Sequence, residues 1–144
     1  MDRKFKVLFL CTGNSCRSQM AEGILRQMAG DRFEGLSAGL DPKEEVHPLA
    51  IKVMKEVGID ISGQKPKSVS TYLGKESIFY IIVVCNKAQQ SCPRIWPGLG
   101  DKNRYCWPFD DPADATGTED EKLEVFRRVR NEIKEKLNDW IKSH

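Results

Sequence analysis

The chain has 144 residues, 40% of them hydrophobic and 31% charged, and its 23 basic and 21 acidic residues give a net charge of +2. This length and composition fit one globular domain spanning residues 1–144, and so balanced a charge argues against nucleic acid or a membrane surface as the main partner. No run of residues approaches the roughly 18 apolar positions that a transmembrane helix needs.

The cysteines indicate a compartment and a kind of chemistry. Five cysteines are an odd number, which argues against a purely structural disulfide framework, and the apolar run near the amino terminus is too short for a signal peptide. We therefore expect a cytoplasmic protein. The sequence contains no Cys-x2-Cys pair and only two histidines, so we expect no metal site.

The first predicted element is a strand over residues 5–10, followed by a loop of small residues and a helix that reaches about Ala29. Five residues separate Cys11 from Arg17, and four of them are small. Small side chains let successive backbone N–H groups turn into one concave nest, and the helix adds the positive end of its dipole. The planar guanidinium of Arg17 suits a tetrahedral oxyanion.

This pattern predicts an oxyanion-binding loop with Cys11 as the nucleophile at its floor. In such a field the pKa of a thiol falls from about 8.5 to roughly 3.5–7.5. The alternative is a buried structural cysteine that happens to precede a helix cap. The residues predicted to bind the oxyanion are Thr12, Gly13, Asn14, Ser15, Cys16, Arg17 and Ser18.

Further along the chain, strands alternate with helices. Strands are predicted at 33–38, 78–84 and 104–107, and helices at 48–57, at 69–73 and from Thr118 onward. Residues 37–39 are small, as expected where a strand end passes close to the first loop. The last helix begins with a capping box, and its buried stripe comprises Leu123, Phe126, Val129, Ile133, Leu137 and Trp140. The alternation predicts an α/β fold with a three-layer architecture, a four-stranded parallel sheet flanked by helices.

Two more cysteines follow the most apolar strand. Cys85 stands at the end of that strand, at the same sheet edge as Cys11, and Cys92 lies in the loop beyond it. Such an arrangement suits a thiol–disulfide relay, but two unrelated cysteines explain it equally well. Cys106, inside a short strand, is predicted to be a small core residue, and Cys16 is either a loop filler or an oxidation partner of Cys11.

A carboxyl group on the loop at 108–112 is the candidate general acid. Asp111 is stiffened by Pro112, whereas its neighbour Asp110 is not, and for this reason we prefer Asp111. The alternative is a turn with two solvated aspartates.

Taken together, these motifs resemble the thioredoxin-coupled bacterial arsenate reductases, which share the fold of the low-molecular-weight protein tyrosine phosphatases. The resemblance covers nearly the whole chain and rests on the segments 10–23, 37–39, 54–62 and 109–113 and on the Cys85/Cys92 pair.

The resemblance implies a mechanism and a partner. Arsenate would settle in the loop with Arg17, Cys11 would attack arsenic, and Asp111 would protonate the leaving hydroxyl. Ser18 would hold the Cys11 thiolate by a hydrogen bond. Cys85 would then attack Cys11 and expel arsenite, Cys92 would take over the disulfide, and thioredoxin would reduce it. A monomer without an organic or metal cofactor would suffice.

Two other function classes remain. The phosphatase branch of the same fold would act on aryl phosphates, but those enzymes usually carry proline at the position of Gln19 and aromatic residues just after the Asp-Pro pair, where this chain has Ala113 and Asp114. A non-catalytic oxyanion sensor would not need the intact set of three cysteines, arginine and aspartate.

One departure from the resemblance concerns a potassium ion. Some members of the family carry threonine and aspartate near such an ion behind the loop, where this chain has Lys65-Pro66-Lys67. We expect the ammonium group of Lys67 or Lys65 to replace the ion, or no ion to bind.

Overall fold

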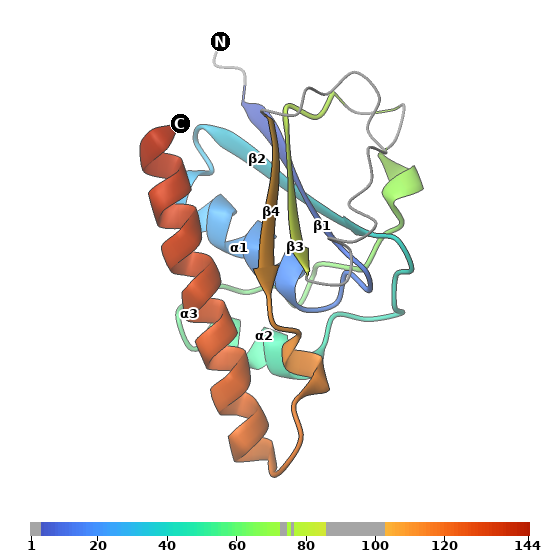
Figure 1. Ribbon diagram of the computed structural model, residues 1–144, viewed down its shortest axis with the longest axis vertical. Helices are drawn as coiled ribbons and strands as arrows, with labels where there is room; N and C mark the ends of the chain where they lie inside the picture. The colour runs from blue at the N-terminus through green and yellow to red at the C-terminus, as the bar shows by residue number, and fades with distance from the viewer. Residues whose placement is uncertain (1–3, 73–74, 76, 86–102) are drawn as a thin grey trace.

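The computed structural model describes residues 4–72, 75, 77–85 and 103–144. Four parallel strands form one sheet in the order β2-β1-β3-β4 (Figure 1). The strands are β1 (Phe5–Cys11), β2 (Phe33–Gly39), β3 (Tyr80–Cys85) and β4 (Arg104–Phe109). The helices are α1 (Arg17–Ala29), α2 (Pro48–Lys55) and α3 (Glu119–Ser143), with short 3-10 turns η1 (Val69–Thr71) and η3 (Pro112–Asp114).

The two central strands owe their position to continuous apolar sequence. In β1 every residue from Val7 to Cys11 is buried, and in β3 residues 81–84 are buried as well. Strands buried on both faces belong in the middle of a parallel sheet, and β1 and β3 lie there. The predicted α/β fold with a four-stranded parallel sheet and flanking helices is confirmed.

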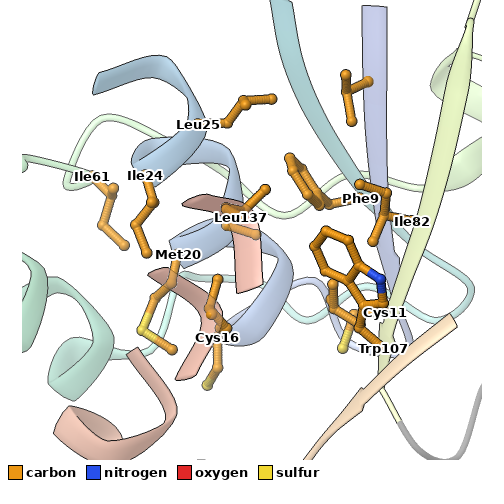
Figure 2. Packing of buried hydrophobic residues seen from close by; sticks show 14 of the residues in the cluster. Phe9, Cys11, Cys16, Met20, Ile24, Leu25, Ile61, Ile82, Trp107 and Leu137 are labelled. Carbon is orange, nitrogen blue, oxygen red and sulfur yellow. The ribbon is translucent and has the colours of Figure 1, made fainter. Parts of the chain in front are cut away.

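Helices α1 and α3 pack on the same face of the sheet, whereas η1 lies on the other side of it from α3 (Figure 1). Ten of the 13 residues of α1 are buried, because this helix lies between the sheet and α3. Leu137 of α3 reaches the cluster formed by Met20 and Ile24 of α1 and by Phe9 and Ile82 of the sheet (Figure 2).

The start of α3 and its buried stripe are as predicted. The Thr118 hydroxyl accepts a hydrogen bond from the Glu121 amide at 3.2 Å, and the Glu121 carboxylate accepts one from the Thr118 amide at 3.3 Å. The six predicted stripe residues are all at most 5% exposed. None of the helices among the described residues is long and apolar enough to cross a membrane.

Strand β4 is longer than predicted, because a bulge accommodates its proline. The register moves from Val83–Cys106 to Cys85–Phe109, so β4 carries one more residue than β3 across this step. Pro108 lies within the extra stretch, and a residue without an amide N–H is tolerated on an edge strand at a bulge. The chain therefore enters the predicted loop after Phe109 rather than after Trp107.

The prediction that Cys106 is a core residue is wrong. Cys106 is exposed on the edge strand β4. Its neighbours Tyr105 and Trp107 point to the α3 side, where the Tyr105 ring lies 6.0 Å from that of Trp140 and Lys136 lies over Trp107. Since side chains alternate along a strand, Cys106 faces the opposite way.

Candidate active site

The loop between β1 and α1 occupies the position where an open α/β sheet binds its ligands. Along the chain, β1 is followed by β2 on one side of it, and β3 and β4 are added on the other side. The sheet order therefore reverses at β1, and the crevice outside the carboxyl end of such a strand is the usual ligand site. Residues 12–16 form the loop at this end, and α1 begins directly after it.

A second segment of chain wraps around the outside of this loop. Its amide groups bond the carbonyl groups of the loop, which therefore face outward. Amide groups of this segment donate to the carbonyl oxygens of the residues from Cys11 onward: Leu40 to Cys11 (3.2 Å), Asp41 to Thr12 (2.9 Å), Lys43 to Gly13 (2.9 Å) and His47 to Ser15 (2.9 Å). The remaining carbonyl, that of Asn14, accepts from Gln19 Nε2 of α1 at 3.0 Å. We call residues 40–47 the outer segment. Because the carbonyls face outward, the amide N–H groups between them face the concave side, as in an anion-binding nest.

The nest is fixed from below by the fully buried Asn14. Its backbone has φ 50°, the left-handed conformation that turns successive amides to one side. Its side chain donates to the Ser18 hydroxyl at 2.7 Å and accepts from Gln19 Nε2 at 3.1 Å and from the Lys67 amide at 2.8 Å. Of the predicted oxyanion-binding residues, Asn14 and Ser18 thus point their side chains into the protein and brace the loop.

The concave side opens into a pocket of about 290 Å³. Its lining comprises Cys11, Thr12, Gly13, Ser15, Cys16, Arg17, Asp41, Pro42, Lys43, Asp111 and Asp114. Cys11 is only 3% exposed, which places it at the floor of the pocket. Five of the seven residues predicted to bind the oxyanion line this pocket.

Arg17 is held in place and still has a donor to offer. One terminal nitrogen donates to the Phe109 carbonyl at 2.9 Å, and the other lies 3.3 Å from Asp111 Oδ2. The side chain is buried, yet its Nε–H finds no hydrogen-bond partner among the described residues. An unpaired buried donor is costly, and an oxyanion in the pocket would satisfy it.

The two candidate acids differ in where they point. Asp111 lines the pocket, pairs with Arg17, and accepts a hydrogen bond from the Ala113 amide at 3.0 Å, so its carboxyl group is fixed at the rim. Asp110 turns away toward α3, where its carboxylate lies 3.3 Å from Arg128. The geometry favours Asp111 over Asp110 for contact with a bound ligand.

The cysteines of the site are not equivalent. Burial raises the pKa of Cys16 to about 12 despite the weaker, opposite effect of a hydrogen bond with Ser15, so Cys16 stays a protonated thiol. This environment supports its role as a loop filler. Cys85 ends β3, next to β1 at the same sheet edge, and pairs in register with Phe109. Cys92 lies outside the described residues.

Comparison with known proteins places the chain in a family. Residues 6–143 match the family described as low molecular weight phosphotyrosine protein phosphatase. The chain belongs to this family. Among its relatives, the arsenate reductases of Halalkalibacterium halodurans and Bacillus subtilis are each 43% identical to it over 137 residues, covering 95% of both chains.

Solved structures of the phosphatase family agree with this assignment. One described as an arsenate reductase in the phosphate binding state superposes with a TM-score of 0.81 at 35% identity, covering 96% of this chain and 98% of the other. The low molecular weight protein tyrosine phosphatase from T. tengcongensis gives a TM-score of 0.80 at 26% identity, covering 98% and 100%. The resemblance to arsenate reductases with the fold of this phosphatase family is therefore confirmed.

Gly39 fits the predicted close approach between the end of β2 and the family's loop. A Cβ atom at this position would lie 2.6 Å from the Thr12 carbonyl oxygen and 3.1 Å from the Asn14 amide nitrogen, both backbone atoms that cannot easily yield. We expect Gly39→Ala to destabilise the protein by about 1–3 kcal/mol and to weaken phosphate binding at least about tenfold, since the nest must shift. Thermal unfolding and calorimetric titration with phosphate measure the two effects.

Gly63→Ala is the matched control, because a Cβ at that glycine meets no atom within 4 Å. Equal phosphate affinity in the Gly39→Ala variant and in the unmodified protein would contradict the close approach.

Behind the loop, the described residues bring a buried carboxyl group close to an ammonium group. Glu22 is buried and accepts a hydrogen bond from the Ser37 hydroxyl at 2.8 Å, and burial raises its pKa. The nearby ammonium group of Lys67 donates to the Lys65 carbonyl at 2.7 Å. Burial lowers the pKa of Lys67, whereas the Glu22 charge raises it. This arrangement is the one expected if the Lys67 ammonium group takes the place of an ion.

We therefore expect the affinity for phosphate to change less than about twofold when sodium is replaced by potassium at constant ionic strength. Without a specific ion site, the salt acts only by screening charges, and this screening depends on ionic strength. Calorimetric titration in the two salts checks this. In a Lys67→Met variant the buried Glu22 loses one of its two neighbouring cations and keeps only the more exposed Arg26, and a potassium dependence should appear. A steep rise in affinity with potassium in the unmodified protein would overturn the assignment.

Several residues of the site belong to no motif and could not be assigned to it from the sequence. Gln19 bridges the Asn14 carbonyl and the Lys65 carbonyl, and Lys43 and Asp114 line the pocket from polar stretches that resemble ordinary surface loops. The only signal for Lys43 in the sequence is that a basic residue follows shortly after the small residues 37–39.

Proposed function

We propose that the protein reduces arsenate to arsenite through a relay of Cys11, Cys85 and Cys92 that thioredoxin resets. The observation that carries this proposal is the coincidence of an oxyanion nest over Cys11 with the end of β3 at Cys85 on the neighbouring strand. The curated relatives that are 43% identical over 95% of their length are arsenate reductases.

The chemistry begins with binding and attack. The nest amides and the Arg17 Nε–H hold the oxygens of arsenate above Cys11. The Cys11 thiolate attacks arsenic and forms a sulfur–arsenic bond. A hydroxyl group leaves and takes a proton from Asp111, so water is released. The Ser18 hydroxyl already accepts a hydrogen bond from Asn14, so its own proton remains available to the thiolate.

The electrons move in the second step. The Cys85 thiolate attacks the Cys11 sulfur, the sulfur–arsenic bond breaks, and its electron pair stays on arsenic, which leaves as arsenite. Cys92 then attacks Cys85, which frees Cys11 and leaves a Cys85–Cys92 disulfide. The dithiol of thioredoxin reduces that disulfide, so two thiol electrons are consumed in each cycle. A relay reset in this way belongs in a reducing compartment such as the cytoplasm.

The strand register supports the first disulfide. Leu10 of β1 pairs with Val83 of β3, so continuing the register brings Cys85 one residue beyond the level of Cys11. Adjacent strands lie roughly 4.8 Å apart and rise about 3.3 Å per residue, which gives a Cα separation of about 6 Å. Disulfides bridge Cα separations of about 4.4–6.8 Å when the two Cβ vectors converge. Because residues one step apart along paired strands face opposite sides of the sheet, the bond also requires the backbone at the end of β3 to turn.

The test is arsenate-dependent oxidation of NADPH in the presence of thioredoxin and thioredoxin reductase, run beside hydrolysis of an aryl phosphate. We expect sustained NADPH oxidation with one arsenite formed per NADPH, and slow hydrolysis at most. Fast hydrolysis without arsenate-dependent oxidation would favour the phosphatase branch, and oxyanion binding without either activity would favour a sensor.

A phosphatase side activity is expected on chemical grounds, because phosphate has the same tetrahedral shape as arsenate and can occupy the same nest. The rim argues against efficient use of a phenyl ring. Asp114 lines the pocket at the position that follows Ala113, where the phosphatase branch carries aromatic residues. A carboxylate offers no stacking surface for the ring of an aryl phosphate.

A further inference from the structure

More negative than positive side chains line the pocket. An anion is therefore attracted only if one of the two cations of the pocket is not already paired with a carboxylate. Three carboxylates line it, those of Asp41, Asp111 and Asp114, against the cations Arg17 and Lys43. Arg17 is already matched by Asp111 at 3.3 Å. A doubly charged oxyanion entering this pocket needs a further positive charge close by, since two like charges near each other at low dielectric repel strongly.

Lys43 is positioned to supply that charge. Its backbone amide donates to the Gly13 carbonyl at 2.9 Å, which fixes the residue beside the nest. A Cβ on Gly13 would lie 3.3 Å from both Cγ and Cε of Lys43, so the aliphatic stem lies along Gly13 at the pocket wall. Among the described residues the Lys43 ammonium group makes no hydrogen bond and no ion pair.

The positive charge of Lys43 acts on buried groups of the loop and its support. Burial dominates the pKa of Cys16, but the positive charge of Lys43 acts on that buried thiol in the opposite direction, as does Arg17. It also adds to the effect of burial in lowering the pKa of His47, whose amide anchors the Ser15 carbonyl. The charge of the ammonium group therefore acts on the end of the nest formed by Ser15 and Cys16.

We propose that Lys43 is a second oxyanion-binding residue, whose ammonium group closes over a doubly charged tetrahedral anion held by the nest and Arg17. This inference rests on the proposed function of the loop as an oxyanion site and deepens it by naming what selects the charge of the substrate. Lys43 hydrogen-bonds one of the outward-facing oxygens and offsets part of the negative charge of Asp41 and Asp114. Doubly charged arsenate or phosphate is therefore preferred over singly charged oxyanions.

The test is calorimetric titration of the reduced, full-length protein with inorganic phosphate. Lys43→Met keeps the stem over Gly13 and removes the charge, and it should weaken phosphate binding about tenfold or more, as loss of a charge-assisted hydrogen bond does. Lys43→Arg keeps the charge and should stay within about threefold of the unmodified protein. The loss in Lys43→Met should shrink as salt is added.

Lys52→Met is the matched control, because Lys52 is an exposed lysine on α2 outside the pocket lining and its loss changes the net charge equally. Its phosphate affinity should equal that of the unmodified protein. In arsenate turnover, Lys43→Met should raise KM in the same proportion and leave kcat within about twofold, as removal of uniform binding does.

Three outcomes would overturn the proposal. Equal phosphate affinity in Lys43→Met and the unmodified protein removes Lys43 from the binding set while leaving the proposed function intact. An equal loss in Lys43→Met and Lys43→Arg assigns the effect to packing over Gly13 rather than to charge. Failure of the unmodified protein to bind phosphate or arsenate at all overturns the proposed function together with this inference.

Discussion

Cys85→Ser is expected to lower thioredoxin-dependent arsenate turnover by at least about three orders of magnitude, the scale of losing one member of a catalytic set. A hydroxyl group at position 85 cannot attack the Cys11 sulfur, so arsenic stays bonded to Cys11 and arsenite is not released. Hydrolysis of an aryl phosphate needs only Cys11, Arg17 and an acid, so any such activity should persist in this variant. NADPH oxidation and release of the aryl alcohol measure the two activities.

Two further cysteine variants make this experiment decisive. Cys11→Ser should abolish both activities, because it removes the nucleophile that they share. Cys106→Ser should change neither, since Cys106 is exposed on β4 and outside the pocket lining. If the Cys85→Ser variant still turned over arsenate with thioredoxin, the order of the relay would be wrong.

Arg17→Lys is expected to lower kcat/KM about 10²–10³-fold for arsenate and for any aryl phosphate alike, the cost of removing a preorganised donor from an oxyanion site. A lysine has no planar fork. It cannot bond the Phe109 carbonyl, pair with Asp111 and present the Nε–H to the ligand at the same time, as Arg17 is placed to do. Steady-state kinetics with both substrates checks the expectation.

Arg26→Lys on the same helix is the control, since its side chain is 52% exposed and contacts Glu22 at 3.8 Å and the Asp60 carbonyl at 3.5 Å, both outside the pocket lining. Its kinetics should match those of the unmodified protein. Thermal unfolding of Arg17→Lys distinguishes a loss of catalysis from a loss of fold. Retention of kcat/KM within tenfold in a folded Arg17→Lys protein would contradict the assigned role.

The sequence was sufficient to predict structure where a local residue pattern reflects a physical requirement of the fold. Apolar runs identified β1 and β3 as strands, the capping box identified the start of α3, and small residues at 37–39 anticipated the close approach that Gly39 makes. The spacing from Cys11 to Arg17, followed by a helix, placed the nest at the carboxyl edge of the sheet.

The sequence was insufficient where the outcome depends on which face of an element is covered or on backbone atoms alone. The alternation of β4 indicates two faces but not which one α3 covers, and Cys106 was therefore assigned to the wrong one. The outer segment contacts the nest mainly through its amide groups, which every residue except proline carries, so residues 40–47 had no distinguishing composition. Lys43 consequently resembled an ordinary surface lysine.

The bonds that shape the nest span long stretches of chain. The Lys67 amide closes a span of 53 residues when it reaches Asn14, and Gly39 is bonded to the Lys67 carbonyl as well. Ring closures of this length are entropically unfavourable until most of the native contacts exist. A fragment that ends before residue 67 would carry the complete signature from Cys11 to Ser18 and yet lack the scaffold that makes it a receptor, so recognition here is a property of the finished tertiary structure rather than of the motif.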